Sequence, residues 1–140
     1  MDNYFKLQIP ANGMNEKFAR SVVASFAVYC SPTLEEINDL KTAVSEAVTN
    51  CVVHAYADGD GIIEIEASVD IKDRSLTVTV TDFGCGIANV DEAKEPFYTT
   101  RPDDERSGMG FTIIETFTDE MCVESEPQKG TKVIMKKVFK

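Results

Sequence analysis

The sequence contains few of the residues that build metal or redox sites. It has a single histidine, His54, and four cysteines that lie far apart with no Cys-x-x-Cys pair. Structural zinc sites need several such ligands at characteristic spacings, so the sequence argues against a zinc site. We expect the cysteines to be free thiols, with Cys30 and Cys51 on apolar helix faces.

Basic residues and long apolar runs are also scarce. The 140 residues include 14 lysines and arginines against 24 acidic residues, which gives a formal net charge of −10. Nucleic-acid binding requires clustered basic residues, so this balance predicts no nucleic-acid partner and favours a protein partner with a basic surface. No apolar run could span a bilayer and the first residues lack a signal-peptide pattern. We therefore expect no membrane contact and a cytoplasmic location.

The order of the predicted elements indicates the fold class. Strand patterns occur at residues 4–9, 62–69, 75–81, 121–125 and 131–139. Helix patterns occur at residues 14–30, 33–56, 90–94 and 109–117. We predict one domain, residues 1–140, with an α/β fold. More specifically, it would be an α+β two-layer sandwich in which helices cover one face of a mixed, mostly antiparallel sheet.

Two details of the helices are specific enough to test. Thr33 and Glu36 have the spacing of a capping box, which predicts the start of the second long helix. In the first helix, apolar residues recur at four-residue spacing and predict an amphipathic helix. They are Met14, Phe18, Val22 and Phe26, with Ala19, Val23, Ala27 and Cys30 beside them.

A line of polar residues interrupts the apolar surface of the second helix. Glu46, Asn50 and His54 follow at four-residue spacing, which predicts one side of an α-helix. Asparagine is a poor residue for a helix interior, and its amide oxygen suits a hard cation such as Mg²⁺. A carboxylate one turn away can act as a general base. For each residue alone, a solvated helix face is the alternative interpretation.

Two glycine-containing turns follow later in the chain. Asp82 ends a strand and enters the turn Asp82-Phe83-Gly84-Cys85-Gly86. Glycines there would let a flat ring approach the backbone, and the carboxylate could accept a hydrogen bond from an exocyclic amine such as that of adenine. Aspartate and glycine are also common in ordinary turns.

The second turn, Gly108-Met109-Gly110, opens a helix after residues 95–107, which we interpret as a mobile loop. Free backbone N–H groups at a helix start attract phosphate oxygens. Arg101, Arg106 and Ser107 lie just upstream and could supply further donors. A helix start that happens to use glycine is the alternative.

In this order, the three patterns resemble the N, G1 and G2 boxes of the GHKL group, the Bergerat-fold ATPases and kinases. The resemblance extends over residues 14–131 and implies that ATP or ADP binds together with Mg²⁺. It implies that Glu46 is the catalytic base and that Asn50 is the Mg²⁺ ligand. It also implies that Asp82 contacts the adenine amine in a pocket shaped by Gly84 and Gly86. The other implied nucleotide-binding residues are Thr99, Thr100, Arg101, Arg106, Ser107, Gly108, Met109, Gly110 and Thr131, with residues 95–107 as an ATP lid.

Three segments, residues 42–50, 96–102 and 106–111, are similar to the anti-sigma-factor serine kinases that act in sporulation. This resemblance implies a protein-serine kinase that uses Mg-ATP to phosphorylate a serine of an anti-anti-sigma (STAS) protein. It also implies that the chain binds and inhibits a sigma factor and forms a homodimer. The glycine box at Gly108 and Gly110 is shorter than that of histidine kinases.

A nucleotide-gated protein-binding module without significant kinase activity is the alternative function. Glu46 separates the two possibilities, because a pure binder would not need a carboxylate one turn before the metal ligand. Arg20 is a candidate partner-contact residue, since it lies off the apolar stripe of the first helix and arginine is frequent in interface hot spots. A plain surface charge is the alternative interpretation of Arg20.

Overall fold

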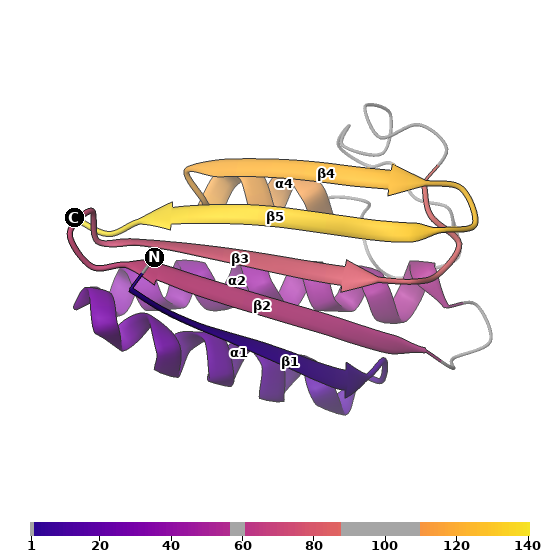
Figure 1. The fold of residues 1–140 in the computed structure, drawn as a ribbon, viewed down its shortest axis with the longest axis horizontal. Helices are drawn as coiled ribbons and strands as arrows, with labels where there is room; N and C mark the ends of the chain where they lie inside the picture. The colour runs from indigo at the N-terminus through magenta and orange to yellow at the C-terminus, as the bar shows by residue number, and fades with distance from the viewer. Residues whose placement is uncertain (1, 57–60, 88–109) are drawn as a thin grey trace.

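The computed structural model describes residues 2–56, 61–87 and 110–140, in which five strands form one sheet of order β1-β2-β3-β5-β4 (Figure 1). The strands are β1 Asn3–Pro10, β2 Ile62–Asp70, β3 Ser75–Asp82, β4 Glu120–Glu126 and β5 Gly130–Val138. The helices are α1 Met14–Ala27, the 3₁₀-helix η1 Val28–Cys30, α2 Leu34–Asn50, the π-helix η2 Cys51–Ala55 and α4 Gly110–Phe117.

The helices form a second layer on one face of the sheet. In Figure 1 the sheet lies in front, and α1, α2 and α4 all lie behind it. The predicted α+β two-layer sandwich is therefore confirmed. The sequence allowed a mixed sheet, but all four pairings among the described strands are antiparallel. Short hairpins join β2 to β3 and β4 to β5, and only antiparallel neighbours can be joined in this way.

The hydrophobic core lies between the sheet and α2, which packs against α1 on one side and α4 on the other. The largest fully buried side chains come from all of these layers: Val23, Leu40, Val44, Val48, Ile63, Ile65, Leu76, Val78, Val80, Ile114 and Met135. Helix α2 is thus held along most of its length, which fixes the polar residues near its C-terminal end.

Helix α1 buries mainly the smaller residues of its predicted apolar side. Ala19, Val23 and Ala27 are fully buried, whereas Met14 is 79% exposed and Phe18 is 49% exposed. The small buried side chains let α1 pack closely on its neighbours, which leaves two of the larger residues at the surface. Spacing alone could not distinguish these two adjacent faces.

The predicted start of α2 is confirmed. The Thr33 hydroxyl accepts a hydrogen bond from the Glu36 N–H at 3.1 Å, and the Thr33 N–H donates to the Glu36 carboxylate at 2.9 Å. This reciprocal pair satisfies two backbone donors that the first turn of a helix otherwise leaves without partners.

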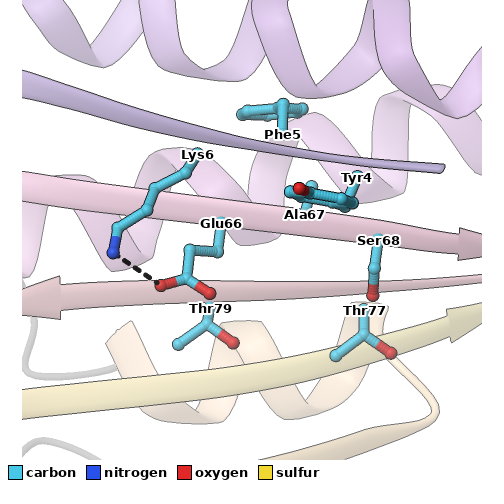
Figure 2. Close-up of a pocket in the computed structure, with 8 residues that line it drawn as sticks. All are labelled: Tyr4, Phe5, Lys6, Glu66, Ala67, Ser68, Thr77 and Thr79. Carbon is cyan, nitrogen blue, oxygen red and sulfur yellow. Dashed lines mark ion pairs between the residues drawn. The ribbon is translucent and has the colours of Figure 1, made fainter. Parts of the chain in front are cut away.

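The face of the sheet away from the helices carries polar side chains. Figure 2 shows Lys6 paired with Glu66, at 3.7 Å, and Lys6 also pairs with Glu64 at 3.1 Å. Tyr4 and Thr79 lie beside them around a hollow of about 340 Å³. None of the residues predicted to bind or react lines this hollow, so the candidate site is elsewhere.

Some predictions concern residues that the structure does not describe. The predicted helix at 90–94 and the predicted lid at 95–107 lie outside the described residues. So do seven predicted site residues: Thr99, Thr100, Arg101, Arg106, Ser107, Gly108 and Met109. In the described segments, no helix is both long and apolar enough to cross a bilayer.

Candidate functional site

The described site residues gather at one end of the sandwich. Asp82 is the last residue of β3 and pairs with Thr131 at the start of β5. Glu46 and Asn50 lie near the C-terminal end of α2, and Gly110 is the first residue of α4, which packs on α2. In Figure 1 the ends of β3 and α2 and the start of β5 all lie at the right of the view. The ends of α2 and of β3, which carry the first two sequence patterns, therefore lie at the same end of the sandwich.

Glu46 and Asn50 lie one turn apart in α2, and both are partly buried. After Asn50 the chain continues into the π-helix η2. A π-helix bonds each residue to the fifth residue along, so its turn is wider than that of an α-helix. Glu46 and Asn50 thus lie one turn apart in α2 as the spacing predicts, whereas His54 lies in η2. Single π turns occur often at functional sites.

The carboxylate of Asp82 is held in one orientation. Its side chain is nearly buried, at 5% exposure. One oxygen, Oδ1, accepts hydrogen bonds from the backbone N–H groups of Gly84 at 3.0 Å and Thr131 at 3.2 Å. The Cys51 thiol lies near the same carboxylate and donates to the Ala47 carbonyl at 3.4 Å. The two N–H donors come from the turn after β3 and from β5, so the carboxylate position depends on both.

Burial governs the protonation of this cluster. Desolvation raises the pKa of Asp82, although the Gly84 N–H, the Cys51 thiol and the Thr131 N–H act in the opposite direction. Burial also raises the pKa of the Cys51 thiol well above its usual value, and the Asp82 charge raises it further. The thiol therefore stays protonated and acts as a donor. The sequence reasoning missed Cys51, because its apolar neighbours indicated only a core position.

The turn after β3 packs directly against η2. The Cys85 N–H donates to the Ala55 carbonyl at 3.0 Å, and the Cys85 thiol donates to the His54 carbonyl at 3.2 Å. A Cβ atom on Gly84 would lie 2.1 Å from the Ala55 oxygen, so this contact requires glycine. Gly86 follows in the same turn. Whether Gly84 and Gly86 also contact a bound ring stays a prediction.

Tyr56 joins three elements at the edge of the site. Its hydroxyl accepts from the Phe83 N–H at 2.7 Å and donates to the Ile62 carbonyl at 2.7 Å. The residue thus ties the end of η2 to the start of β2 and to the turn after β3. Burial raises the pKa of Tyr56, which keeps the bridging hydroxyl protonated. No sequence pattern predicts this role of Tyr56, because it depends on residues distant along the chain.

A hydroxyl pair lies next to Asp82 on β4 and β5. The Ser125 Oγ is 2.8 Å from the Thr131 Oγ1, accepts from the Ile87 N–H at 2.7 Å and donates to the Gly130 carbonyl at 2.9 Å. Thr131 was predicted from the sequence, whereas Ser125 was not. The β4–β5 register, which places Ser125 opposite Thr131, is the signal that could have found it.

Comparison with known proteins shows the family to which this chain belongs. The family model described as "Histidine kinase-like ATPase domain" matches residues 9–137. A protein named anti-sigma F factor from Clostridium kluyveri is 54% identical over 99% of this chain and 96% of its own length. The chain belongs to the anti-sigma F factor family of histidine kinase-like ATPase domains. A protein of the same name from Clostridium acetobutylicum is 55% identical over 99% of this chain and 96% of its own length. Another from Caldanaerobacter subterraneus is 53% identical over 97% of this chain and 94% of its own length.

Solved structures agree with this family assignment. The RsbU and RsbW domains of a Mycobacterium tuberculosis protein match with a TM-score of 0.69 over 98% of this chain and 32% of that one. At 17% identity, this likeness shows the fold alone. A blue-light activated histidine kinase from Erythrobacter litoralis matches with a TM-score of 0.56 and 26% identity, over 77% of this chain and 32% of that one. The predicted Bergerat fold is confirmed.

The donor set of this anti-sigma F factor family member fits a nucleotide better than a bound metal alone. Asp82 is a buried acceptor of the kind that binds an amine, and the fold implies nucleotide binding. In the described parts of the chain, no three His, Cys, Asp or Glu side chains form a metal cluster. Mg²⁺ often takes only one or two protein ligands and completes its shell with water and phosphate oxygens. The Asn50 amide oxygen fits that mode of binding.

Proposed function

We propose that this protein is an anti-sigma factor and a protein-serine kinase of the cytoplasm. It binds and inhibits a sigma factor, and it uses Mg-ATP to phosphorylate a serine of an anti-anti-sigma STAS-domain protein that controls sporulation transcription. The observation that carries this proposal is the 54% identity, over 99% of the chain, to a protein named anti-sigma F factor. The geometry around Asp82, Glu46 and Asn50 supports it.

Asp82 would bind the adenine amine of ATP or ADP. An ionised carboxylate can only accept hydrogen bonds, and this one is oriented by two backbone N–H donors in a nearly buried setting. A charge-assisted hydrogen bond from an amine is strong under such conditions. Gly84, Gly86 and Thr131 would complete the adenine side, while Gly110 and the predicted residues at 99–109 would hold the phosphates.

Glu46 and Asn50 would divide the chemistry between them. Asn50 would hold Mg²⁺, which supplies charge neutralisation for the phosphate oxygens when it is bound. Glu46 would accept the proton of the incoming serine hydroxyl, or orient that hydroxyl, as its oxygen bonds to the γ-phosphorus and the bond from that phosphorus to the departing ADP breaks. Their spacing of one helical turn places the base beside the metal ligand.

The test of the kinase is transfer of labelled γ-phosphate from ATP to the STAS-domain protein by wild type and Glu46→Gln. We expect the variant to transfer phosphate about 100-fold more slowly, because general-base catalysis typically contributes 10²–10⁴-fold. Glu35→Gln is the matched control, since Glu35 is an exposed glutamate in the first turn of the same helix. Equal rates for Glu46→Gln and wild type would remove the base role.

The same experiment decides the alternative function. If neither wild type nor variant transfers phosphate while both bind ATP, the protein is a nucleotide-gated binding module. If wild type does not bind ATP, the proposal of a nucleotide site is itself wrong.

We further propose that α1 contacts a protein partner through Arg20. Its guanidinium pairs with Glu16 of the same helix at 3.4 Å, and the exposed side chains of Met14 and Phe18 lie on that helix too. Arginine is enriched among the hot spots of protein interfaces.

Arg20→Glu should weaken sigma-factor or STAS-protein binding by about tenfold or more, as hot-spot residues do. Lys17→Glu, on the same helix with the same charge change, should have a smaller effect in the same titration. Normal binding of both partners by Arg20→Glu would exclude this contact. The proposed homodimer is tested separately by sedimentation of the wild-type protein.

A further inference from the structure

Three polar side chains form one row across the end of the sheet. Asp82 on β3 pairs directly with Thr131 on β5, and Thr131 pairs directly with Ser125 on β4. Directly paired residues of antiparallel strands project to the same side of the sheet. The row therefore continues from the proposed adenine-binding carboxylate through Thr131 to Ser125.

The hydrogen of the Ser125 hydroxyl has only one possible destination. A serine hydroxyl has one hydrogen to donate and two lone pairs. The Ile87 N–H, 2.7 Å away, can only donate and so occupies one lone pair. The Gly130 carbonyl, 2.9 Å away, can only accept and so takes the hydrogen.

The third neighbour of Ser125 is then fixed as a donor. Distance alone lets either hydroxyl donate in the 2.8 Å contact between Ser125 and Thr131. If Ser125 donated to Thr131, its oxygen would face the Gly130 carbonyl oxygen at 2.9 Å without a hydrogen between them. Only donation by Thr131 makes all three contacts hydrogen bonds, so the Thr131 hydrogen is committed to Ser125.

This order of hydrogens defines what the row can offer a ligand. Thr131 keeps only lone pairs for any further partner, and the ionised Asp82 carboxylate likewise accepts without donating. A purine with an amino group at C6 donates hydrogens there, whereas a 6-oxo purine presents an acceptor oxygen. An acceptor-only row that faces C6 favours the first and repels the oxygen of the second.

We propose that Ser125 is a positioning residue that determines base specificity: it holds the Thr131 hydroxyl as an acceptor and thereby selects a 6-amino purine nucleotide over a 6-oxo one. This inference rests on the proposed nucleotide site at Asp82 and names a second residue that sets its selectivity. Ser125 acts through Thr131 and need not touch the base.

The test compares the affinities of the full chain for ATP and for inosine triphosphate, both with Mg²⁺, by calorimetry. Wild type should prefer ATP. Ser125→Ala frees the Thr131 hydrogen to turn toward a 6-oxo group, so the preference for ATP should fall by about 3- to 10-fold, the value of one or two net hydrogen bonds. If the role of Ser125 were merely structural, Ser125→Ala would weaken the binding of both nucleotides equally. An unchanged ATP preference would therefore overturn the inference.

Three further variants isolate the hydroxyl pair. Thr131→Val removes the hydroxyl and should also reduce the ATP preference, and adding Ser125→Ala to it should then change the preference no further. Ser125→Thr keeps a hydroxyl at position 125 and should retain the preference. If Ser125→Ala does not fold, as judged by circular dichroism, Thr131→Val against Ser125→Thr decides the question, and equal preferences in these two would overturn the inference. Absence of ATP binding by wild type would instead overturn the proposed function.

Discussion

Asp82 combines a proposed role in binding with a cost to folding. Its pKa is raised by burial, so the folded state holds the proton more tightly than the unfolded chain does. The stability that Asp82 contributes is thus complete below the pKa of the unfolded chain and is lost as pH rises through the folded pKa. At neutral pH the buried charge destabilises the fold, which is common for residues selected for function.

Asp82→Asn tests this balance. The amide keeps an oxygen for the Gly84 and Thr131 N–H groups but carries no charge. We expect the free energy of unfolding at pH 7 to stay equal or rise, because the variant no longer buries a charge. This gain should vanish as the pH falls below the unfolded pKa of about 4. ATP affinity should fall by about tenfold or more, because the amide presents a donor to the base.

Urea unfolding at several pH values measures the stability of this variant, and calorimetry measures its nucleotide affinity. Asp73→Asn, on the exposed β2–β3 turn, is the matched control for removing one acidic charge. A clear loss of stability at pH 7 in Asp82→Asn, or unchanged ATP affinity, would contradict the interpretation of Asp82.

The start of β5 lies close beside the end of β3 in the sheet. Gly130 has a φ of +104°, and a Cβ atom there would lie 2.1 Å from the Asp82 carbonyl oxygen. Both the backbone conformation and the close contact therefore require glycine. This approach allows the Thr131 N–H to reach the Asp82 carboxylate at 3.2 Å.

Gly130→Ala should lower the free energy of unfolding by about 2 kcal/mol or more, through backbone strain and overpacking together. It should also weaken ATP binding, because the new methyl group must displace the backbone that carries Asp82. Gly13→Ala is the matched control, since Gly13 has a φ of −64° and nothing lies within 4 Å of the added carbon. Chemical unfolding of both variants checks the prediction, and equal losses would contradict it.

Local chemistry explains which elements the sequence could predict. The capping box at Thr33 and Glu36 and the alternating strands involve near neighbours, so they were predicted almost to the residue. The π-helix η2 was not, because it packs against the turn at Gly84, about 30 residues later. For the same reason, the sequence predicted Asp82 and Thr131 as site residues but not Cys51 and Ser125. The positions of the last two follow from packing and from strand register.

The molecule as a whole has two ends with different contacts. At one end lie Asp82, η2 and the start of β5. At the other, Arg74 of the β2–β3 turn donates to the Cys30 and Ser31 carbonyls at 3.1 and 2.8 Å, which ties the sheet to η1. A ligand at the first end would bridge elements that are otherwise joined by a few hydrogen bonds, whereas the second end is already closed by protein contacts.

Hydrogen exchange should therefore respond to nucleotide at one end only. With saturating Mg-ATP, we expect slower exchange of the Gly84, Cys85 and Thr131 amides, because ligand binding suppresses local opening. The Ser31 and Arg74 amides should exchange at unchanged rates, and they serve as the internal control. Uniform protection of both ends would show a global stabilisation, and no protection would argue against a site at Asp82.

The two described ends of the chain lie far from the candidate site. The Asp2 N–H bonds the Val69 carbonyl and the Lys140 N–H bonds Glu36, both beside the β2–β3 turn, and Figure 1 marks both termini at the left. Strand β3 separates that side from Asp82, a span of about 24 Å at roughly 3.4 Å per residue. A fluorophore or a surface tether attached at either terminus would thus leave the site open to solution. Single-molecule measurements of nucleotide and partner binding could use either attachment point.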